Sequence, residues 1–295
     1  MSIHTLVDRL CGRLHDTAQY TTQGVTLFVD LENRKTRRKY LPADVLTHFL
    51  GGRGANMWLL YNLLQEEKDA LDPEVPLIFG SGVLTSVMPS ATRGNFTSKS
   101  PESYAILDAN GGDYFPSFLK RHGYDHLVLY GKAAQWTLLR IALGEVTFED
   151  ATPYAGLNNL DTAAAVERDF NCKERKDMAL ARITSAGENG VLCAGIMGGI
   201  KAIWARGGGG AKMGAHNLKA IMVHGRPPEI ALPADAKAQN KAIGKKITGT
   251  SVIKNALKMV GTPFLYKPSR VLGAMGTKNN QETTWVEALD ADNFD

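Results

Sequence analysis

Cysteine is scarce in this chain of 295 residues, which contains only Cys11, Cys172 and Cys193. The number is odd, and no two of the three lie close enough to form a Cys-x-x-Cys motif. The sequence therefore supplies neither a disulfide framework nor a cysteine-rich metal site of its own. We interpret the three as reduced thiols of a cytoplasmic protein.

Long apolar runs are also missing, so we expect no membrane span. The N-terminal segment "MSIHTLVDRLCGRLHD" lacks the continuous apolar core of a signal peptide. Leu6, Leu10 and Leu14 recur in it at the spacing of one face of a short helix. We expect residues 1–21 to form an N-terminal extension that docks on the domain or on a partner.

The chain has little excess charge of either sign. Its formal net charge is +4, with 22% charged and 44% hydrophobic residues, which is a soluble globular composition. A nucleic-acid-binding protein usually concentrates its basic residues on one face, so we do not expect that class of partner. The densest basic run, residues 34–39, predicts a hairpin turn and a solvated edge strand.

The usual nucleotide-binding motifs are absent. There is no Gly-x-x-x-x-Gly-Lys-Ser/Thr, and no Gly-x-Gly-x-x-Gly follows a strand with an acidic residue at the expected distance. A phosphate-bearing ligand would have to bind by another scheme.

Strands dominate the pattern that is present. We expect strands at residues 25–31, 36–41, 76–80, 94–98, 103–108, 126–131, 136–143, 145–150, 178–184, 190–197 and 219–225. We expect helices at residues 44–50, 56–67, 114–123 and 161–170. Because the helices do not alternate strictly with the strands, the pattern predicts an α+β fold with mixed or antiparallel sheets.

The composition changes after Gly225. "RPPEIALP" predicts a linker, and residues 234–260 have a helical pattern. We therefore expect an N-terminal domain over residues 22–225. Residues 226–295 should hold the linker and the incomplete start of an all-α domain, because the final "ALDADNFD" does not close a core.

Glycine is concentrated beside polar anchors in four stretches. They are "GGRGAN" (51–56), "PSATRGN" (89–95), "DANGGDYF" (108–115) and "ARGGGGAKMG" (205–214), and three of them contain arginine. Glycine allows positive φ and close approach of backbone to a ligand, successive amides can bind an anion, and arginine suits phosphate. A single such loop is explained equally well by a turn, but four in one domain favour a phosphate-bearing ligand.

Longer segments around these stretches resemble one family. "FLGGRGANMWLL", "PLIFGSGVLTSVMPSATRGNFTSKSP", "DANGGDYFPSFLKRHGYDHLVLYGKA" and "AGENGVLCAGIMGGIKAIWARGGGGAKMGAHNLKAIMVHG" occur in order. Together they resemble the N-terminal part of the tungsten-dependent aldehyde ferredoxin oxidoreductases over roughly residues 22–225. A weaker similarity at "GTKNNQ" extends into the early second domain.

The resemblance implies a cofactor. Members hold tungsten between two pyranopterins, each with a phosphate, and a magnesium ion bridges the two. By resemblance, Arg93 contacts a pterin phosphate, and the backbone carbonyls of Asn110 and Ile203 bind the magnesium. The further residues implied to line the pterins are Gly112, Ala205, Arg206 and Gly207. The bare glycine backbone of residues 207–210 would let this cofactor lie against the chain.

One position departs from the family pattern. The family usually has arginine just before the magnesium carbonyl, whereas this chain has Ala202 preceded by Lys201. Lys201 is either a replacement charge, without the planar guanidinium fork, or a solvated surface lysine. Elsewhere we expect Cys193 and Met213 to be core residues and His122 to follow a helix. Glu188 either bonds a pterin amino group or serves a turn.

The resemblance also implies parts that this chain does not supply. Members bind a [4Fe–4S] cluster through Cys-x-x-Cys-x-x-x-Cys and a distant cysteine, and their acid–base residues lie in later domains; nothing in this sequence matches them. We therefore assign no catalytic residue here. The expected function is the cofactor-binding portion of a tungsten or molybdenum bis-pyranopterin oxidoreductase that oxidises aldehydes and passes electrons to ferredoxin or an iron–sulfur subunit.

Three organisations remain open for such a chain. It is a fragment of a full-length oxidoreductase, a split subunit completed by a second polypeptide, or a non-catalytic module that binds pterin or another phosphate ligand. An ordinary phosphate-ligand enzyme without metal is a further alternative, and a homo-oligomer is compatible with all of them.

Overall fold

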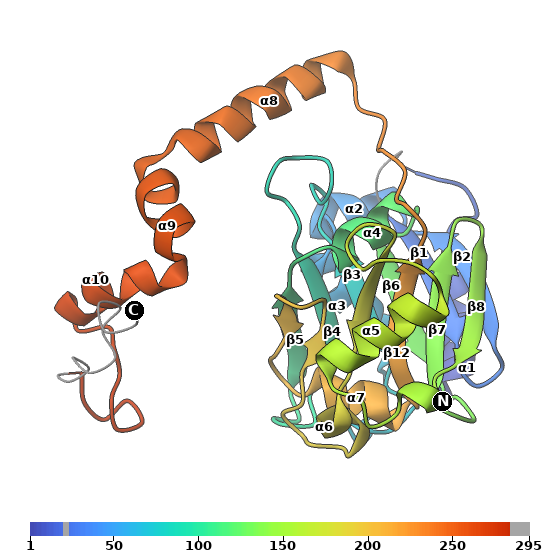
Figure 1. Cartoon of the computed structure of the whole chain (residues 1–295). Coiled ribbons are helices and arrows are strands. Elements are labelled where there is room, and N and C mark those ends of the chain that lie inside the picture. The colour runs from blue at the N-terminus through green and yellow to red at the C-terminus, as the bar shows by residue number, and fades with distance from the viewer. Residues whose placement is uncertain (20–23, 284–295) are drawn as a thin grey trace. The chain divides into compact units, whose positions relative to one another are not determined.

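The structure is a computed structural model that describes residues 1–19 and 24–283 (Figure 1). The chain divides into two compact units, Met1–Ala231 and Leu232–Asp295. The last twelve positions of the predicted second domain, residues 284–295, lie outside the described residues.

Two six-stranded sheets form the centre of the first unit among the described residues. The order in the first sheet is β2 (Lys35–Tyr40), β1 (Val25–Asp30), β6 (His126–Tyr130), β3 (Leu77–Ser81), β4 (Gly94–Lys99) and β5 (Ile106–Gly111). The β1–β6 pair is parallel and the other neighbours are antiparallel. The basic run lies in exposed β2 at the edge of this sheet, so that prediction is confirmed.

The second sheet is mixed in the same way. Its order is β11 (Ile203–Trp204), β10 (Ile196–Met197), β9 (Met178–Arg182), β12 (Leu218–His224), β7 (Thr137–Ala142) and β8 (Glu145–Asp150). The β7–β12 pair is parallel, and the remaining neighbours are antiparallel. Both sheets carry helices on their faces, which confirms the predicted α+β fold.

The helices of the first unit are short. They are α1 (Ile3–Cys11), α2 (Ala43–Phe49), α3 (Arg53–Leu63), α4 (Phe115–Arg121), the 3-10 turn Thr152–Tyr154, α5 (Asn159–Asp169), α6 (Ser185–Glu188) and α7 (Gly209–Ala215).

Three hydrophobic clusters define the layers of this unit. The largest lies between the sheets, because Val29 and Phe79 of the first sheet share it with Ile141 and Ile221 of the second. A second cluster joins α1–α3 to the other face of the first sheet. A third joins α5 to the other face of the second sheet, where Figure 1 shows α5 crossing β7 and β12. The order is helices, sheet, sheet, helix.

The N-terminal helix belongs to this architecture. Leu6, Leu10 and Leu14 are all buried in the cluster that contains α3, although α1 already ends at Cys11. Of the two alternatives for residues 1–21, docking on the domain is therefore the one observed for the described part of that segment.

Two predicted elements differ from the structure in their extent. The expected strand over residues 190–197 is reduced to Ile196–Met197, and Cys193 beside it is exposed rather than in the core. The segment leaves the sheet because its backbone serves α7 instead, with the Ala194 carbonyl accepting from the amide of Gly210 at 2.7 Å. Strand β5 also starts later than expected and continues to Gly111.

The second unit is helical in its described part. Its elements are α8 (Ala234–Gly249), the π-helical turn Ile253–Leu257, α9 (Lys258–Val260), the 3-10 turn Thr262–Leu265 and α10 (Tyr266–Val271). None of these elements contains a buried residue. Across residues 1–19 and 24–283, no helix is long and apolar enough to cross a membrane.

Candidate functional site

The edge of the first sheet carries one half of the predicted site. Strand β5 is the last strand of that sheet, and its Asn110 lies opposite Asn95 of β4. Gly112 follows the strand directly, and a Cβ added there would meet no atom within 4 Å. Arg93 precedes Gly94, which pairs with Gly111, so this exposed arginine lies at the same end of β5 as Gly112.

The other half is brought to β5 by Trp204. A Cβ on Gly111 would lie 2.5 Å from the Trp204 ring, so only glycine lets the indole pack against β5. The indole Nε1 donates to the Gly94 carbonyl at 3.4 Å. Ile203, the neighbour of Trp204 in β11, keeps 44% of its surface exposed. The structure thus places Asn110 and Ile203, far apart in sequence, on adjoining segments.

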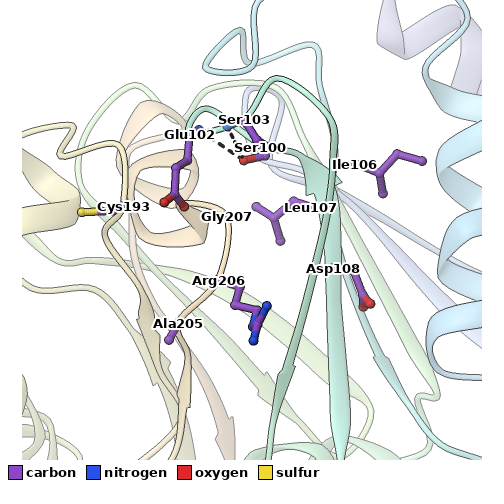
Figure 2. A pocket seen from close by; sticks show the side chains of 10 residues that line it. All are labelled: Ser100, Glu102, Ser103, Ile106, Leu107, Asp108, Cys193, Ala205, Arg206 and Gly207. Carbon is purple, nitrogen blue, oxygen red and sulfur yellow. Dashed lines mark hydrogen bonds between the residues drawn. The ribbon is translucent and has the colours of Figure 1, made fainter. Parts of the chain in front are cut away.

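A cavity of about 430 Å³ lies beside this edge (Figure 2). Its lining residues are Ser100, Glu102, Ser103, Ile106, Leu107, Asp108, Cys193, Ala205, Arg206 and Gly207. Three of the predicted pterin-lining residues are among them. Figure 2 shows the side chain of Arg206 extending from its loop toward β5.

Arginine and lysine side chains lie around this edge, and the cavity also holds the carboxylates of Glu102 and Asp108. Arg93, Lys201 and Arg206 are exposed. Asp108 of the cavity is paired with Arg53 at 2.9 Å, which offsets its charge. Arginine donates two parallel hydrogen bonds to phosphate, so the open guanidinium groups of Arg93 and Arg206 fit a phosphate-bearing ligand.

The glycine run, in contrast, is explained by internal packing. Gly208 has φ +78°, and a Cβ there would overlap the Leu192 carbonyl oxygen. A Cβ on Gly209 would meet the Phe96 ring at 2.8 Å, and one on Gly210 would meet the Gly195 carbonyl at 2.5 Å. The prediction that the bare backbone of residues 208–210 faces a cofactor is therefore wrong, because this backbone seats α7 against the domain.

Two amides of the predicted anion-binding loops are likewise used internally. The N–H of Gly52 donates to the Ser81 carbonyl at 3.0 Å, and that of Gly210 to Ala194. Lys212 of the same motif is buried and donates to the carbonyls of Ala70 and Val75; burial lowers its pKa to about 7. The site therefore fits an anionic group through its arginines, its cavity and the open backbone at Gly112.

A buried polar network that the sequence did not indicate holds β5 in place. Asn56 of α3 donates to Asn95 Oδ1 at 3.0 Å, and its own Oδ1 lies 2.8 Å from His126 Nδ1. Asn95 Nδ2 donates to Asp108 at 2.5 Å and to the Asn110 side chain at 3.3 Å. Asn56 and Asn95 occur in the glycine-rich stretches, but nothing in those stretches pairs them.

The remaining predicted residues have structural roles. Glu188 forms a buried ion pair with Lys219 and accepts from the Gly156 amide at 2.7 Å, so its side chain joins distant segments of the domain rather than serving a local turn. His122 follows α4, as predicted, and is buried. Met213 is in the core, which confirms that prediction. Ala202 closes a turn by accepting from the Gly198 amide at 2.9 Å.

The fold and the site together define a class: an α+β domain of two packed mixed sheets with an arginine-lined cavity at a sheet edge. Comparison with known families gives the particular one. The family model of the aldehyde ferredoxin oxidoreductase N-terminal domain matches residues 26–225. The chain belongs to this family, and the predicted relationship is confirmed.

Individual relatives agree with this assignment. The chain is 34% identical over 207 residues to a tungsten-containing aldehyde ferredoxin oxidoreductase of Pyrococcus furiosus, covering 70% of this chain and 34% of that protein. It is also 34% identical over 221 residues to an aliphatic sulfonate oxidoreductase, WOR-like subunit, of the same organism, covering 71% and 35%. The chain thus spans about a third of the length of these two relatives.

A solved structure shares the fold. The active site complex BamBC of benzoyl coenzyme A reductase, determined with 1,5-dienoyl-CoA, superposes with a TM-score of 0.65 at 31% sequence identity. The match covers 69% of this chain and 31% of that chain.

Proposed function

We propose that this chain is the cofactor-binding portion of a tungsten or molybdenum bis-pyranopterin oxidoreductase. The observation that carries the proposal is the packing of Trp204 on Gly111, which brings the segment Ile203–Gly207 to the end of β5 that holds Asn110 and Gly112, beside one cavity. Membership of the family and the tungsten-containing relatives support the choice of cofactor.

The residues at this edge would hold the cofactor as follows. Arg93 and Arg206 bind the pterin phosphates, and the backbone carbonyls of Asn110 and Ile203 bind the magnesium. Gly112 leaves room for the pterins, and Ala205 and Gly207 line the cavity beside it. Lys201, exposed beside Ala202, supplies a point charge where the family usually has arginine. When bound, the metal supplies Lewis-acid and two-electron redox chemistry, and this chain binds and orients it.

The reaction proposed for the complete enzyme is oxidation of an aldehyde to a carboxylic acid. Water would supply the added oxygen, two protons would be released, and a [4Fe–4S] cluster with ferredoxin or an iron–sulfur subunit would be needed to accept the two electrons. The cluster ligands and the acid–base residues would come from further domains or a second subunit. One relative is an aliphatic sulfonate oxidoreductase, WOR-like subunit, so a substrate assay should compare aldehydes with aliphatic sulfonates.

The second candidate is a non-catalytic module that binds pterin or another phosphate ligand. The open guanidinium groups of Arg93 and Arg206 favour it, because they fit a phosphate whether or not a reaction follows.

Elemental analysis after anaerobic purification from the native source separates the candidates. Tungsten or molybdenum with about four irons per chain would identify a component of the complete oxidoreductase. Tungsten or molybdenum without iron would identify the cofactor-holding module. A preparation with none of these metals and no pterin would contradict both.

Replacing Arg93 or Arg206 by alanine should release the cofactor while leaving the fold intact. A hydrogen bond to a charged group contributes about 1.5–3 kcal/mol, so each variant should lose pterin during dialysis about tenfold faster or more. Pterin fluorescence after denaturation measures the fraction retained. Arg168→Ala is the matched control, because Arg168 is an exposed arginine of α5, on the outer face of the second sheet. Full pterin content in both variants would show that the two arginines do not bind the phosphates.

A further inference from the structure

A buried carboxylate lies between the two halves of the site. Asp113 directly follows Gly112 and adopts φ +63°, which is unusual for a residue other than glycine. Its side chain is only 6% exposed, and its Oδ1 accepts from Arg175 Nη2 at 3.0 Å.

The second oxygen of this carboxylate faces the turn that leads to β11. Asp113 Oδ2 is buried and has no hydrogen-bond partner. It lies 2.6 Å from where a Cβ on Gly199 would be, and Gly199 has φ +122°, so only glycine fits beside the carboxylate. Gly199 belongs to the turn that the Gly198–Ala202 hydrogen bond closes, and Ile203 comes next.

The turn and the partner of Asp113 are each held by other elements. Asn159 of α5 donates to the Gly199 carbonyl of the turn at 3.4 Å. The Arg175 guanidinium lies over the Tyr114 ring at 4.9 Å, and the Arg175 backbone amide donates to the Met178 carbonyl at 2.7 Å. Arg175 is therefore held by the segment that leads into β9, and Asp113 connects that segment to the β5 end.

We propose that Asp113, paired with Arg175, is a positioning residue that fixes the β5 end against the turn of residues 198–202, and thereby sets the spacing of the Asn110 and Ile203 carbonyls for Mg²⁺. Asp113 lies three residues after Asn110, and Gly199 lies four before Ile203. The inference rests on the proposed function, because it assigns a role in the same cofactor site. It assigns roles to Asp113 and Arg175, which the proposed function does not use.

The test compares Asp113→Asn with Asp125→Asn in the cofactor-loaded protein. Asp125 is a matched control, because it is a similarly buried carboxylate whose side chain bonds Lys120 and the Val25 amide rather than Arg175. Two readouts are needed: amide hydrogen exchange of residues 198–203, and magnesium retained after dialysis against EDTA. Residues that orient metal ligands typically change metal affinity 10–100-fold, so Asp113→Asn should lose magnesium about tenfold faster than the control.

Charge-conserving and charge-removing changes at Arg175 complete the design. Arg175→Gln should reproduce the faster exchange and magnesium loss, and Arg175→Lys should restore most of the retention. Because the Arg175 side chain is 37% exposed, these variants keep the test valid if Asp113→Asn does not fold.

The outcomes separate this inference from the proposed function. Unaltered protein that holds pterin and magnesium, with variants that retain magnesium as well as the control does, would overturn the positioning role alone. Faster exchange at residues 198–203 without faster magnesium loss would overturn it as well. Unaltered protein with neither pterin nor magnesium would overturn the proposed function, and the inference with it.

Discussion

Trp204→Ala should destabilise the first unit by about 3–5 kcal/mol, the usual cost of deleting a buried tryptophan side chain. Trp204 is 1% exposed and lies edge-on to Phe79 of the first sheet and Phe115 of α4, with ring centroids 5.7 and 5.8 Å away. It belongs to β11 of the second sheet, so its removal leaves a cavity between the two sheets. Typical domain stabilities are only about 5–15 kcal/mol, so a large part of the total would be lost.

Chemical denaturation followed by far-UV circular dichroism measures this effect. Trp58→Ala is the control, because Trp58 is a half-buried tryptophan at the edge of the α1–α3 cluster. We also expect Trp204→Ala to lose pterin, since Trp204 holds Ile203 beside β5. A free energy of unfolding within about 1 kcal/mol of the unaltered protein would contradict the central role of this side chain.

Acid should destabilise the first unit well before its carboxylates titrate. Burial lowers the pKa of His126 to about 4 and that of His216 to about 3. Each ring uses Nδ1 in a hydrogen bond, to Asn56 and to the Gly131 carbonyl respectively, and leaves Nε2 buried without a partner. Protonation would place a proton on that unpartnered nitrogen, so the folded state resists it.

The sign of the pH dependence follows from these directions. Between about pH 6.5 and pH 4 the unfolded chain binds protons that the folded chain does not, so the free energy of unfolding falls as the pH falls. Each pKa unit corresponds to about 1.4 kcal/mol, so the loss is on the order of 3 kcal/mol per histidine at pH 4. The lowered pKa values of His122 and His224, also caused mainly by burial, act in the same direction.

Urea denaturation at a series of pH values between 4 and 7 tests this account. His126→Asn and His216→Asn place a non-titrating amide near the position of Nδ1, so each should flatten the pH dependence. His48→Gln removes an exposed histidine and should leave the profile unchanged. A profile that stays equally steep in both asparagine variants would show that other groups cause the acid sensitivity.

Patterns along the chain were sufficient to predict the α+β fold class and the family. Short apolar runs predict most strands of both sheets, because a strand that is buried on both faces is apolar along its whole length. The order of the glycine-rich segments placed Asn110, Ile203 and Arg206 as candidates. Such local features survive in the sequence because each depends on residues close together in the chain.

Two predictions from the sequence were wrong, because each depended on contacts with residues far away in the chain. Residues 190–197 have the composition of a buried strand, but the Ala194 carbonyl bonds to the α7 amide of Gly210 and Cys193 is exposed. The four consecutive glycines favour ligand contact by their composition alone. Gly208, Gly209 and Gly210 instead lie against Leu192, Phe96 and Gly195, which no spacing rule identifies.

The sequence by itself thus determined the α+β class, the family and the residue types of the candidate site. Only the tertiary structure decided which of those residues meet. Trp204 packing on Gly111 joins the two halves of the site, Asn56 and Asn95 support β5, and Asp113 pairs with Arg175. The physical reason is that each of these contacts joins residues separated by tens of positions, and long-range pairing depends on how both sheets pack.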